Sequence, residues 1–262
     1  MSKKVYEMTL CEKRALTEDI FEMILAFAPE NKPDAVTPGQ FVGVYTGDAA
    51  MLLPRPVSIC GYDAVEGRLR LVCRAQGAGT RHLRSLVPGA AVRVLGILGN
   101  GYDLAALEGR KVLLLGGGVG IPPMLELAAR LKDRAEVTAV LGYRDAADFL
   151  AEDFAQVCSV YVATEDGSKG IRGNVLDAVR QQGIESDAVC ACGPLPMLRA
   201  VKAYAKEREI PCFVSLEERM ACGIGACLGC VCKTAGEDAH SHVRNARVCT
   251  EGPVFAAEEV EL

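Results

Sequence analysis

Two features are missing from this sequence of 262 residues, and each absence excludes a class of protein. No apolar run reaches the length of a membrane-spanning helix, and residues 1–7 contain no stretch of signal-peptide length. Basic residues are not in excess either. The formal net charge of −5 argues against nucleic acid as a main partner and gives no support to binding an anionic membrane surface. We therefore expect a cytoplasmic protein with no membrane or nucleic-acid partner.

Cysteine, by contrast, is abundant, with twelve residues in the chain. Half the residues are apolar and 24% are charged, as in ordinary soluble proteins. With no sign of export, a reducing cytosol explains these thiols better than disulfide bonds do. Most cysteines outside the C-terminal region lie in apolar surroundings, where we expect them to pack as small hydrophobic side chains. These are Cys11, Cys60, Cys73, Cys158, Cys190, Cys192 and Cys212.

The other five cysteines are concentrated near the C-terminus. Four of them form the run Cys222-x4-Cys227-x2-Cys230-x-Cys232, and Cys249 follows later. Iron–sulfur clusters of the two-iron type take four thiolates from runs with this spacing. Glycines fill the gaps, as expected where a loop wraps closely around a cluster and directs backbone N–H groups at its sulfurs. The run therefore predicts a [2Fe–2S] cluster.

Two alternatives stay open at this site. Structural zinc uses Cys and His at similar spacings, and His240 and His242 lie downstream, although zinc ligands usually come as two separated pairs. Cys232 and Cys249 also compete to be the fourth cluster ligand. Because Cys232 lies only two residues beyond Cys230, the chain has little room to carry it to the opposite iron. We expect Cys249 to be the fourth ligand and Cys232 to be a neighbouring buried thiol.

The pattern of short segments predicts three units and no internal repeat. Residues 1–102 contain short apolar stretches separated by Pro-Gly turns, which is typical of an antiparallel β-barrel. In residues 103–210 buried strands alternate with helices, which predicts an α/β domain with a parallel sheet. Residues 211–262 form a small cysteine-rich unit. The predicted strands of the α/β domain are 111–115, 137–141, 160–162 and 188–191, and its predicted helices are 123–131 and 196–208.

Two turns of the α/β domain predict a nucleotide site. The first is the run Gly116-Gly117-Gly118-Val119-Gly120, which follows a strand and opens a helix, the context of a phosphate-binding turn. The usual third glycine is replaced by Pro123, so this is not an ordinary two-half Rossmann domain. The second is the turn Cys192-Gly193-Pro194, after a later strand. At the carboxyl edge of the sheet it is expected beside the first turn, across the crevice where ligands bind.

The predicted barrel carries two further motifs. In the run Arg55-Pro56-Val57-Ser58 an arginine, which can bind a pyrophosphate through two nitrogens, precedes a hydroxyl by three residues. A serine here could donate a hydrogen bond to a flavin. Gly79 and Thr80 come just before a predicted helix, 81–86, and offer backbone N–H groups to a phosphate. Taken alone, this region could also be an ordinary surface strand.

Together these motifs resemble the ferredoxin–NADP reductase superfamily. Within it, the run from Glu218 to Cys230 and the run from Val248 to Phe255 look like the electron-transfer subunits of NAD-dependent (type B) dihydroorotate dehydrogenases. The resemblance covers nearly the whole chain. It implies a barrel that binds FAD, an α/β domain that binds NAD and a small C-terminal [2Fe–2S] domain.

The resemblance also implies roles for individual residues. FAD is expected at Arg55, Pro56, Val57, Ser58, Val72, Cys73, Arg74, Gly79 and Thr80. NAD is expected at Gly116, Gly117, Gly118, Val119, Gly120, Cys192, Gly193 and Pro194. The cluster ligands are expected to be Cys222, Cys227, Cys230 and Cys249. Weaker candidates are Thr164, Glu165 and Asp166 at the dinucleotide crevice, and Glu217 and Cys212 near the nicotinamide; Glu217 could equally be an ordinary surface charge.

The resemblance implies an oxidoreductase subunit in pyrimidine (UMP) biosynthesis. It is expected to pass electrons from an FMN-containing, dihydroorotate-oxidising partner subunit through a [2Fe–2S] cluster and FAD to NAD+, in a heterotetramer with two of each subunit. No residue in the chain looks like a general base for the substrate's C–H bond, in keeping with this division of labour. The residues leave NAD or NADP open, because Arg144 stands near the end of the second strand, where an arginine can bind a 2′-phosphate.

Two other functions are consistent with the same motifs. One is the flavin and iron–sulfur subunit of a ferredoxin:NADP oxidoreductase or of a sulfide dehydrogenase, which share this architecture. The other belongs to a different class: a redox-sensing regulatory module in which the nucleotide site is vestigial. Apparently complete FAD and NAD motifs argue against the sensor.

Overall fold

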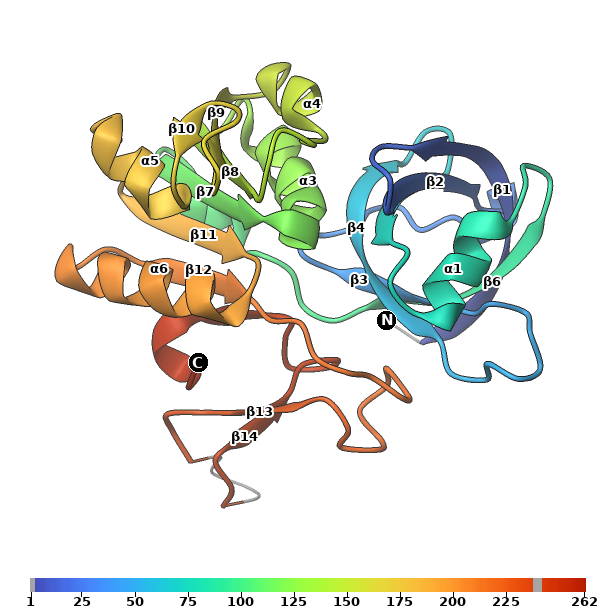
Figure 1. The fold of residues 1–262 in the computed structure, drawn as a ribbon. Helices are drawn as coiled ribbons and strands as arrows, with labels where there is room; N and C mark the ends of the chain where they lie inside the picture. Colours follow the sequence, from blue (N-terminus) through green and yellow to red (C-terminus); the bar gives the residue numbers. More distant parts are fainter. Residues whose placement is uncertain (1–2, 238–241) are drawn as a thin grey trace.

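The computed structural model describes residues 3–237 and 242–262, which form a barrel, a sheet flanked by helices and a small C-terminal hairpin (Figure 1). This arrangement confirms the fold class predicted from the sequence. No helix in these described ranges is both long and apolar enough to cross a lipid bilayer.

The barrel closes on itself because its first and last strands pair. The strands follow the order β1-β2-β5-β4-β3-β6, all antiparallel, and β6 pairs back with β1. Alternating apolar side chains such as Leu69, Leu71 and Cys73 fill its interior. The strands are β1 (Lys4–Ala15), β2 (Ile20–Ala26), β3 (Phe41–Val44), β4 (Arg55–Asp63), β5 (Arg68–Arg74) and β6 (Ala91–Leu98). A 3-10 turn, η1 (Pro29–Asn31), follows β2, and helix α1 (Ala78–Ser85) joins β5 to β6.

The second unit is a sheet in the order β10-β9-β8-β7-β11-β12-β15, parallel except for its last strand. Its central strand β7 is buried on both faces, as the continuous apolar run of residues 112–115 requires. The strands are β7 (Lys111–Gly117), β8 (Glu136–Tyr143), β9 (Ser159–Thr164), β10 (Ile171–Arg172), β11 (Ala188–Cys192), β12 (Cys212–Ser215) and β15 (Val254–Ala256).

Helices cover both faces of this sheet. One face packs against α3 (Ile121–Leu131) and α4 (Ala151–Ala155), the other against α5 (Val175–Gln181) and α6 (Leu195–Glu207). The short helix α2 (Leu104–Leu107) leads from the barrel into β7, and the 3-10 turn η2 (Gly118–Gly120) leads from β7 into α3. The connection from β7 to β11 leaves the two strands adjacent, so the carboxyl ends of β7 and β11 form the topological switch point of the sheet.

The C-terminal segment is continuous with the sheet. It contains the hairpin of β13 (Val231–Lys233) and β14 (Asn245–Arg247), the strand β15 and the 3-10 turn η3 (Ala257–Glu259). Both β12 and β15 lie beyond residue 210 and are nevertheless strands of the sheet. The unit boundaries at residues 102 and 210 stay predictions.

Buried polar contacts join the barrel to the sheet. The Glu126 carboxylate on α3 accepts the Tyr62 N–H of β4 at 3.2 Å. Arg70 on β5 pairs with Glu22 on β2 of the barrel at 2.6 Å and with Asp153 of α4 at 2.7 Å. These contacts hold the two units in one relative position, which matters because the cavities described below lie between them.

Candidate functional site

A cavity of about 540 Å³ lies between the barrel and the sheet. All nine residues predicted to bind FAD line it, although they come from β4, β5 and the start of α1. Its volume and its largely apolar wall with a few polar groups are typical of cofactor sites. The structure therefore brings together in space two motifs that are separated in the sequence by 20 residues.

Arg55 and Gly79 meet directly in this cavity. A Cβ placed on Gly79 would lie 2.0 Å from Arg55 Nε, so only glycine lets the guanidinium rest on the first turn of α1. Arg55 Nη1 donates to the carbonyl of Leu53, and the Thr80 hydroxyl accepts the Gly77 N–H at 3.1 Å. A cation beside a helix N-terminus is a suitable arrangement for the diphosphate of a dinucleotide.

A second cavity, of about 610 Å³, opens at the switch point of the sheet. Seven of the eight residues predicted to bind NAD line it: Gly117, Gly118, Val119, Gly120, Cys192, Gly193 and Pro194. The eighth, Gly116, is buried within β7 and does not reach the cavity wall. Position 116 still requires glycine, because a Cβ there would lie 2.9 Å from the Ile121 side chain.

The two glycine turns lie side by side at this cavity, because β7 and β11 are neighbouring strands. A Cβ on Gly120 would lie 2.2 Å from the carbonyl oxygen of Cys192, and one on Gly117 would lie 2.7 Å from Met197 Sδ. Gly118 adopts φ +53°, a conformation that glycine tolerates best. The turns are thus packed without side chains between them, which leaves their backbone free to approach a phosphate.

The two cavities share one wall. Five residues line both: Arg74, Gln76, Val119, Cys192 and Glu217. Burial raises the pKa of the Cys192 thiol to about 12, so a neutral thiol stands at this junction. The exposed Glu217 follows strand β12 and enters both cavities, as its proposed place near the nicotinamide requires.

The structure does not bring Cys212 to this junction. Cys212 is the first residue of β12 and pairs with Val189, whereas both cavities lie beyond the other end of the strand. It lines neither cavity and packs at the edge of the sheet core. The residue of β12 that does line the flavin cavity is Ser215, the last of the strand, for which the sequence gives no motif.

The three weaker candidates at the end of β9 also differ in whether they line a cavity. Glu165 lines the dinucleotide cavity. The Thr164 hydroxyl donates to the Lys169 carbonyl at 2.7 Å, and Asp166 accepts from Ser168, so these two side chains shape the turn. Arg144, the arginine near the end of the second strand, lines the same cavity together with Asp145 and Glu165.

The cysteine run is organised by the β13–β14 hairpin. Val231 pairs with Arg247, and the Val248 N–H donates to the Cys230 carbonyl at 3.0 Å. This register brings Cys230 and Cys249 together at the open end of the hairpin, although 18 residues separate them. Cys232 lies within the hairpin, opposite Ala246, and packs against the core.

The four predicted ligands form two pairs. The Cys227 side chain hydrogen-bonds to Cys222, and the Cys230 side chain to Cys249. The N–H groups of Ile224 and Gly229 point at the sulfurs of Cys222 and Cys227, each at 3.4 Å. Two thiolates for each of two irons, with backbone N–H groups directed at sulfur, is the donor set of a [2Fe–2S] cluster, and these residues fit it.

The electrostatics of the two pairs differ. Burial raises the pKa of the Cys222 thiol, but hydrogen bonds from the N–H groups of Ile224 and its neighbours and from the Cys227 side chain outweigh it and lower the pKa to about 6. Burial and the adjacent Cys230 thiol raise the pKa of Cys249 to about 11. A cationic partner such as iron would favour the thiolate form of Cys249.

The zinc alternative concerns the two histidines downstream of the cysteine run. Within residues 3–237 and 242–262, no three His, Cys, Asp or Glu side chains converge as ligands of a single metal ion. His242 is exposed and lies 3.4 Å from the Glu237 carboxylate, and His240 lies outside the described residues. All twelve cysteines carry free thiols, which also argues against disulfides.

Several cavity residues are not among the predicted site residues. Phe41, Leu216, Met220 and Pro253 line the flavin cavity, and Tyr143, Asn174 and Met197 line the dinucleotide cavity. They come from strand ends and connections that only the assembled sheet brings together. The usable signal in the sequence was position, since Met220 lies in the run 218–230 and Pro253 in the run 248–255.

Comparison with known proteins gives consistent matches over the whole chain. Residues 217–261 match the iron-sulfur cluster binding domain of dihydroorotate dehydrogenase B, and residues 114–203 match the oxidoreductase NAD-binding domain. The chain is similar to the dihydroorotate dehydrogenase B (NAD(+)) electron transfer subunit of Shouchella clausii, with 41% identity over 266 residues and all of both chains covered. The corresponding subunit of Geobacillus thermodenitrificans is 43% identical over 262 residues, covering 97% of this chain and 98% of that one.

A solved structure shows the same architecture. It is that of an NADH-dependent reduced ferredoxin-NADP oxidoreductase, with a TM-score of 0.85 and 29% identity over 97% of this chain and 89% of the other.

Proposed function

Since this chain belongs to the family of the dihydroorotate dehydrogenase B electron transfer subunits, we propose that it carries electrons from a dihydroorotate-oxidising partner to NAD+. It is an oxidoreductase subunit that uses FAD, a [2Fe–2S] cluster and NAD. When bound, the cluster supplies one-electron transfer and the flavin converts single electrons into hydride. The protein itself positions these groups, surrounds them with suitable charges and excludes water from them.

One observation carries the proposal: the three sites lie in functional order. The dinucleotide cavity shares a wall with the flavin cavity, and residues 218–220, which line the flavin cavity, lead directly into Cys222. On its other side the cysteine loop packs against the barrel, with Gly223 against Leu98. The flavin cavity thus lies between the cysteine loop and the dinucleotide cavity, as a relay requires.

The residues of the chain have distinct tasks in this relay. Arg55 and the first turn of α1 hold the diphosphate of FAD, and Ser58 provides a hydroxyl beside the bound ring. The glycine turn before α3 and the turn after β11 hold the dinucleotide so that its nicotinamide enters the shared wall near Cys192. Glu217 is proposed to orient the nicotinamide there; Cys212 is not assigned a part, because it lies at the opposite end of β12.

The partner is proposed to be an FMN-containing dihydroorotate-oxidising subunit that docks on the cysteine loop. Two observations support this surface. Cys227 is exposed, and Ile224 and Leu228 beside it are 42% and 60% exposed, which gives the loop an apolar rim. We further propose an assembly with two of each subunit, located in the cytoplasm, with its product used in pyrimidine synthesis.

The proposal is tested by co-purifying the chain with its candidate partner and measuring orotate and NADH formation from dihydroorotate and NAD+. We expect equal amounts of both products, and no NADH from the partner alone. Because the similar solved structure is a ferredoxin-NADP oxidoreductase, the same preparation is also assayed with reduced ferredoxin. Turnover with ferredoxin, and none with dihydroorotate, would overturn the assignment.

A redox-sensing module is separated by a simpler assay on the isolated chain. The proposed function requires NADH to reduce an artificial electron acceptor through the bound flavin. A sensor with a vestigial nucleotide site predicts no NADH-driven reduction of any acceptor.

A further inference from the structure

Thr250 directly follows the proposed fourth ligand and carries an unexplained polar atom. Its hydroxyl oxygen is buried and has no hydrogen-bond partner among the residues that the structure describes. A buried hydroxyl without a partner is unfavourable, and each such group in a folded protein calls for a physical explanation. The Thr250 hydroxyl has no assigned role in binding FAD or NAD.

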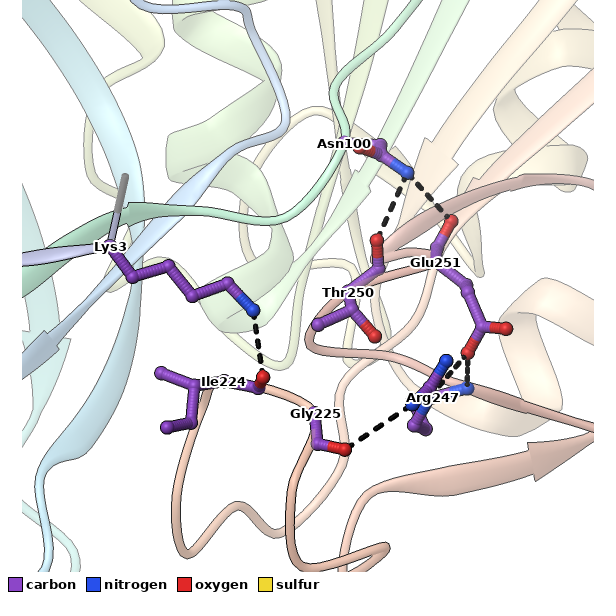
Figure 2. A network of polar contacts seen from close by, with 7 residues as sticks. All are labelled: Lys3, Asn100, Ile224, Gly225, Arg247, Thr250 and Glu251. Carbon is purple, nitrogen blue, oxygen red and sulfur yellow. Dashed lines mark hydrogen bonds and ion pairs between the residues drawn. The ribbon is translucent and has the colours of Figure 1, made fainter. Parts of the chain in front are cut away.

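The backbone holds Thr250 in a fixed position. Its N–H donates to the Arg247 carbonyl at 3.0 Å, and its carbonyl accepts from Asn100 Nδ2 at 3.2 Å (Figure 2). Asn100 also binds the Glu251 carbonyl at 3.1 Å, and Glu251 in turn pairs with Arg247 at 2.9 Å. The segment after Cys249 is thus anchored to the connection between barrel and sheet, which fixes the backbone of Thr250.

The side chain of Thr250 is directed at the loop that carries the first two ligands. In Figure 2 the side chain of Thr250 lies on the side of Gly225. Gly225 belongs to the loop between Cys222 and Cys227. A Cβ on Gly225 would lie 2.9 Å from Thr250 Cγ2 and 3.3 Å from its hydroxyl oxygen. Arg247 Nη1 also donates to the Gly225 carbonyl at 3.3 Å, which fixes this loop against the same segment. Thr250 therefore follows one ligand, Cys249, in the chain and packs against the loop that carries Cys222 and Cys227.

We infer that the Thr250 hydroxyl donates a hydrogen bond to a sulfur atom of the bound cluster and so sets its reduction potential. The inference rests on the proposed function, since it needs the cluster to be present. Thiolate and sulfide sulfurs are acceptors only, and a threonine hydroxyl is the donor they require. Hydrogen bonds to cluster sulfurs are among the factors that set the potential of iron–sulfur centres. Because such a bond stabilises the added negative charge, it raises the potential.

The test uses the complete complex and compares Thr250→Val, which keeps the shape and removes the hydroxyl, with Thr250→Ser, which keeps the hydroxyl. The midpoint potential of the cluster is measured by redox titration followed by electron paramagnetic resonance, with iron and FAD counted in each preparation. We expect a more negative potential in Thr250→Val at unchanged iron content, and a potential near that of the unchanged protein in Thr250→Ser.

Thr234→Val is the matched control, because the Thr234 hydroxyl already donates to the Gly236 carbonyl at 2.8 Å. It is expected to leave the potential unchanged. Unaltered potential in Thr250→Val overturns the inference. Loss of iron in Thr250→Val alone supports it, whereas loss in both Thr250 variants shows a packing role and overturns it. A wild-type preparation without iron contradicts the proposed function itself, before any variant is compared.

Discussion

The positions of individual cysteines along the β13–β14 hairpin decide which thiols lie close together. Cys230 and Cys249 lie at the open end of the β13–β14 hairpin, and both are almost completely buried. Cys232 is closer to Cys230 in sequence, but it lies two residues further into the hairpin. Proximity along the chain is therefore a poor guide to the ligand set, and strand register is a good one.

This register predicts opposite results for two serine substitutions. Cys249→Ser should remove most of the iron and sulfide, because a serine cannot replace a soft thiolate at the buried iron. Cys232→Ser should retain both at the level of the unchanged protein. Iron and acid-labile sulfide per bound FAD provide the measurement. Retention in the first variant and loss in the second would make Cys232 the fourth ligand.

Glycines at the start of α1 provide a second pair of matched substitutions. In Gly79→Ala the new Cβ collides with the Arg55 guanidinium and displaces it from the helix turn. We expect FAD to bind about 10-fold more weakly, which corresponds to about 1.4 kcal/mol. Gly77→Ala adds a Cβ at a position where nothing lies within 4 Å, and it should change the FAD affinity less than about threefold. FAD titration of deflavinated protein measures both; equal effects would contradict the assigned contact.

The helices and strands differ in how well they could be predicted from the sequence. The buried run 111–115 and the glycine turn after it predict β7 and the start of α3 almost to the residue, because local pattern and burial agree there. Cys212 lines neither cavity, because it is the first residue of β12 and the cavities lie beyond the other end of the strand. Ser215 could not be predicted as a cavity residue, since no sequence motif marks the end of β12.

The contact between β5 and α4 yields a prediction on stability. Arg70→Met removes the 2.6 Å partner of Glu22, which is 7% exposed, and breaks the ion pair with Asp153 across the two units. Glu22 keeps its contact with Arg14 at 3.3 Å. We therefore expect a cost of about 2 kcal/mol, below that of a fully unpaired buried charge, and a fall in Tm of about 4–8 °C. Thermal unfolding of the protein with its cofactors bound provides the measurement.

Arg68→Met on the same strand is the control. Its pair with Glu12 is exposed and 3.7 Å long, so its loss should cost less than about 0.5 kcal/mol. A fall in Tm of similar size in both variants would show that Arg70 does not join the units.

In the whole molecule, the contacts between barrel and sheet bring two cavities and the cysteine segment close together. The dinucleotide cavity and the flavin cavity share a wall, and residues 218–220 of the flavin cavity lie just before Cys222 in the chain. Asn100, in the connection between barrel and sheet, binds the Thr250 carbonyl and holds the segment after Cys249 there (Figure 2). The relay therefore depends on both cofactors occupying the same chain.

The most direct measurement counts iron, acid-labile sulfide, zinc and FAD in the purified protein, and follows the spectrum as NADH is added without oxygen. The account predicts two irons and two sulfides for each FAD, no zinc, and reduction of the flavin and the cluster by NADH. A colourless protein that contains zinc, or one that binds iron but no flavin, would contradict it.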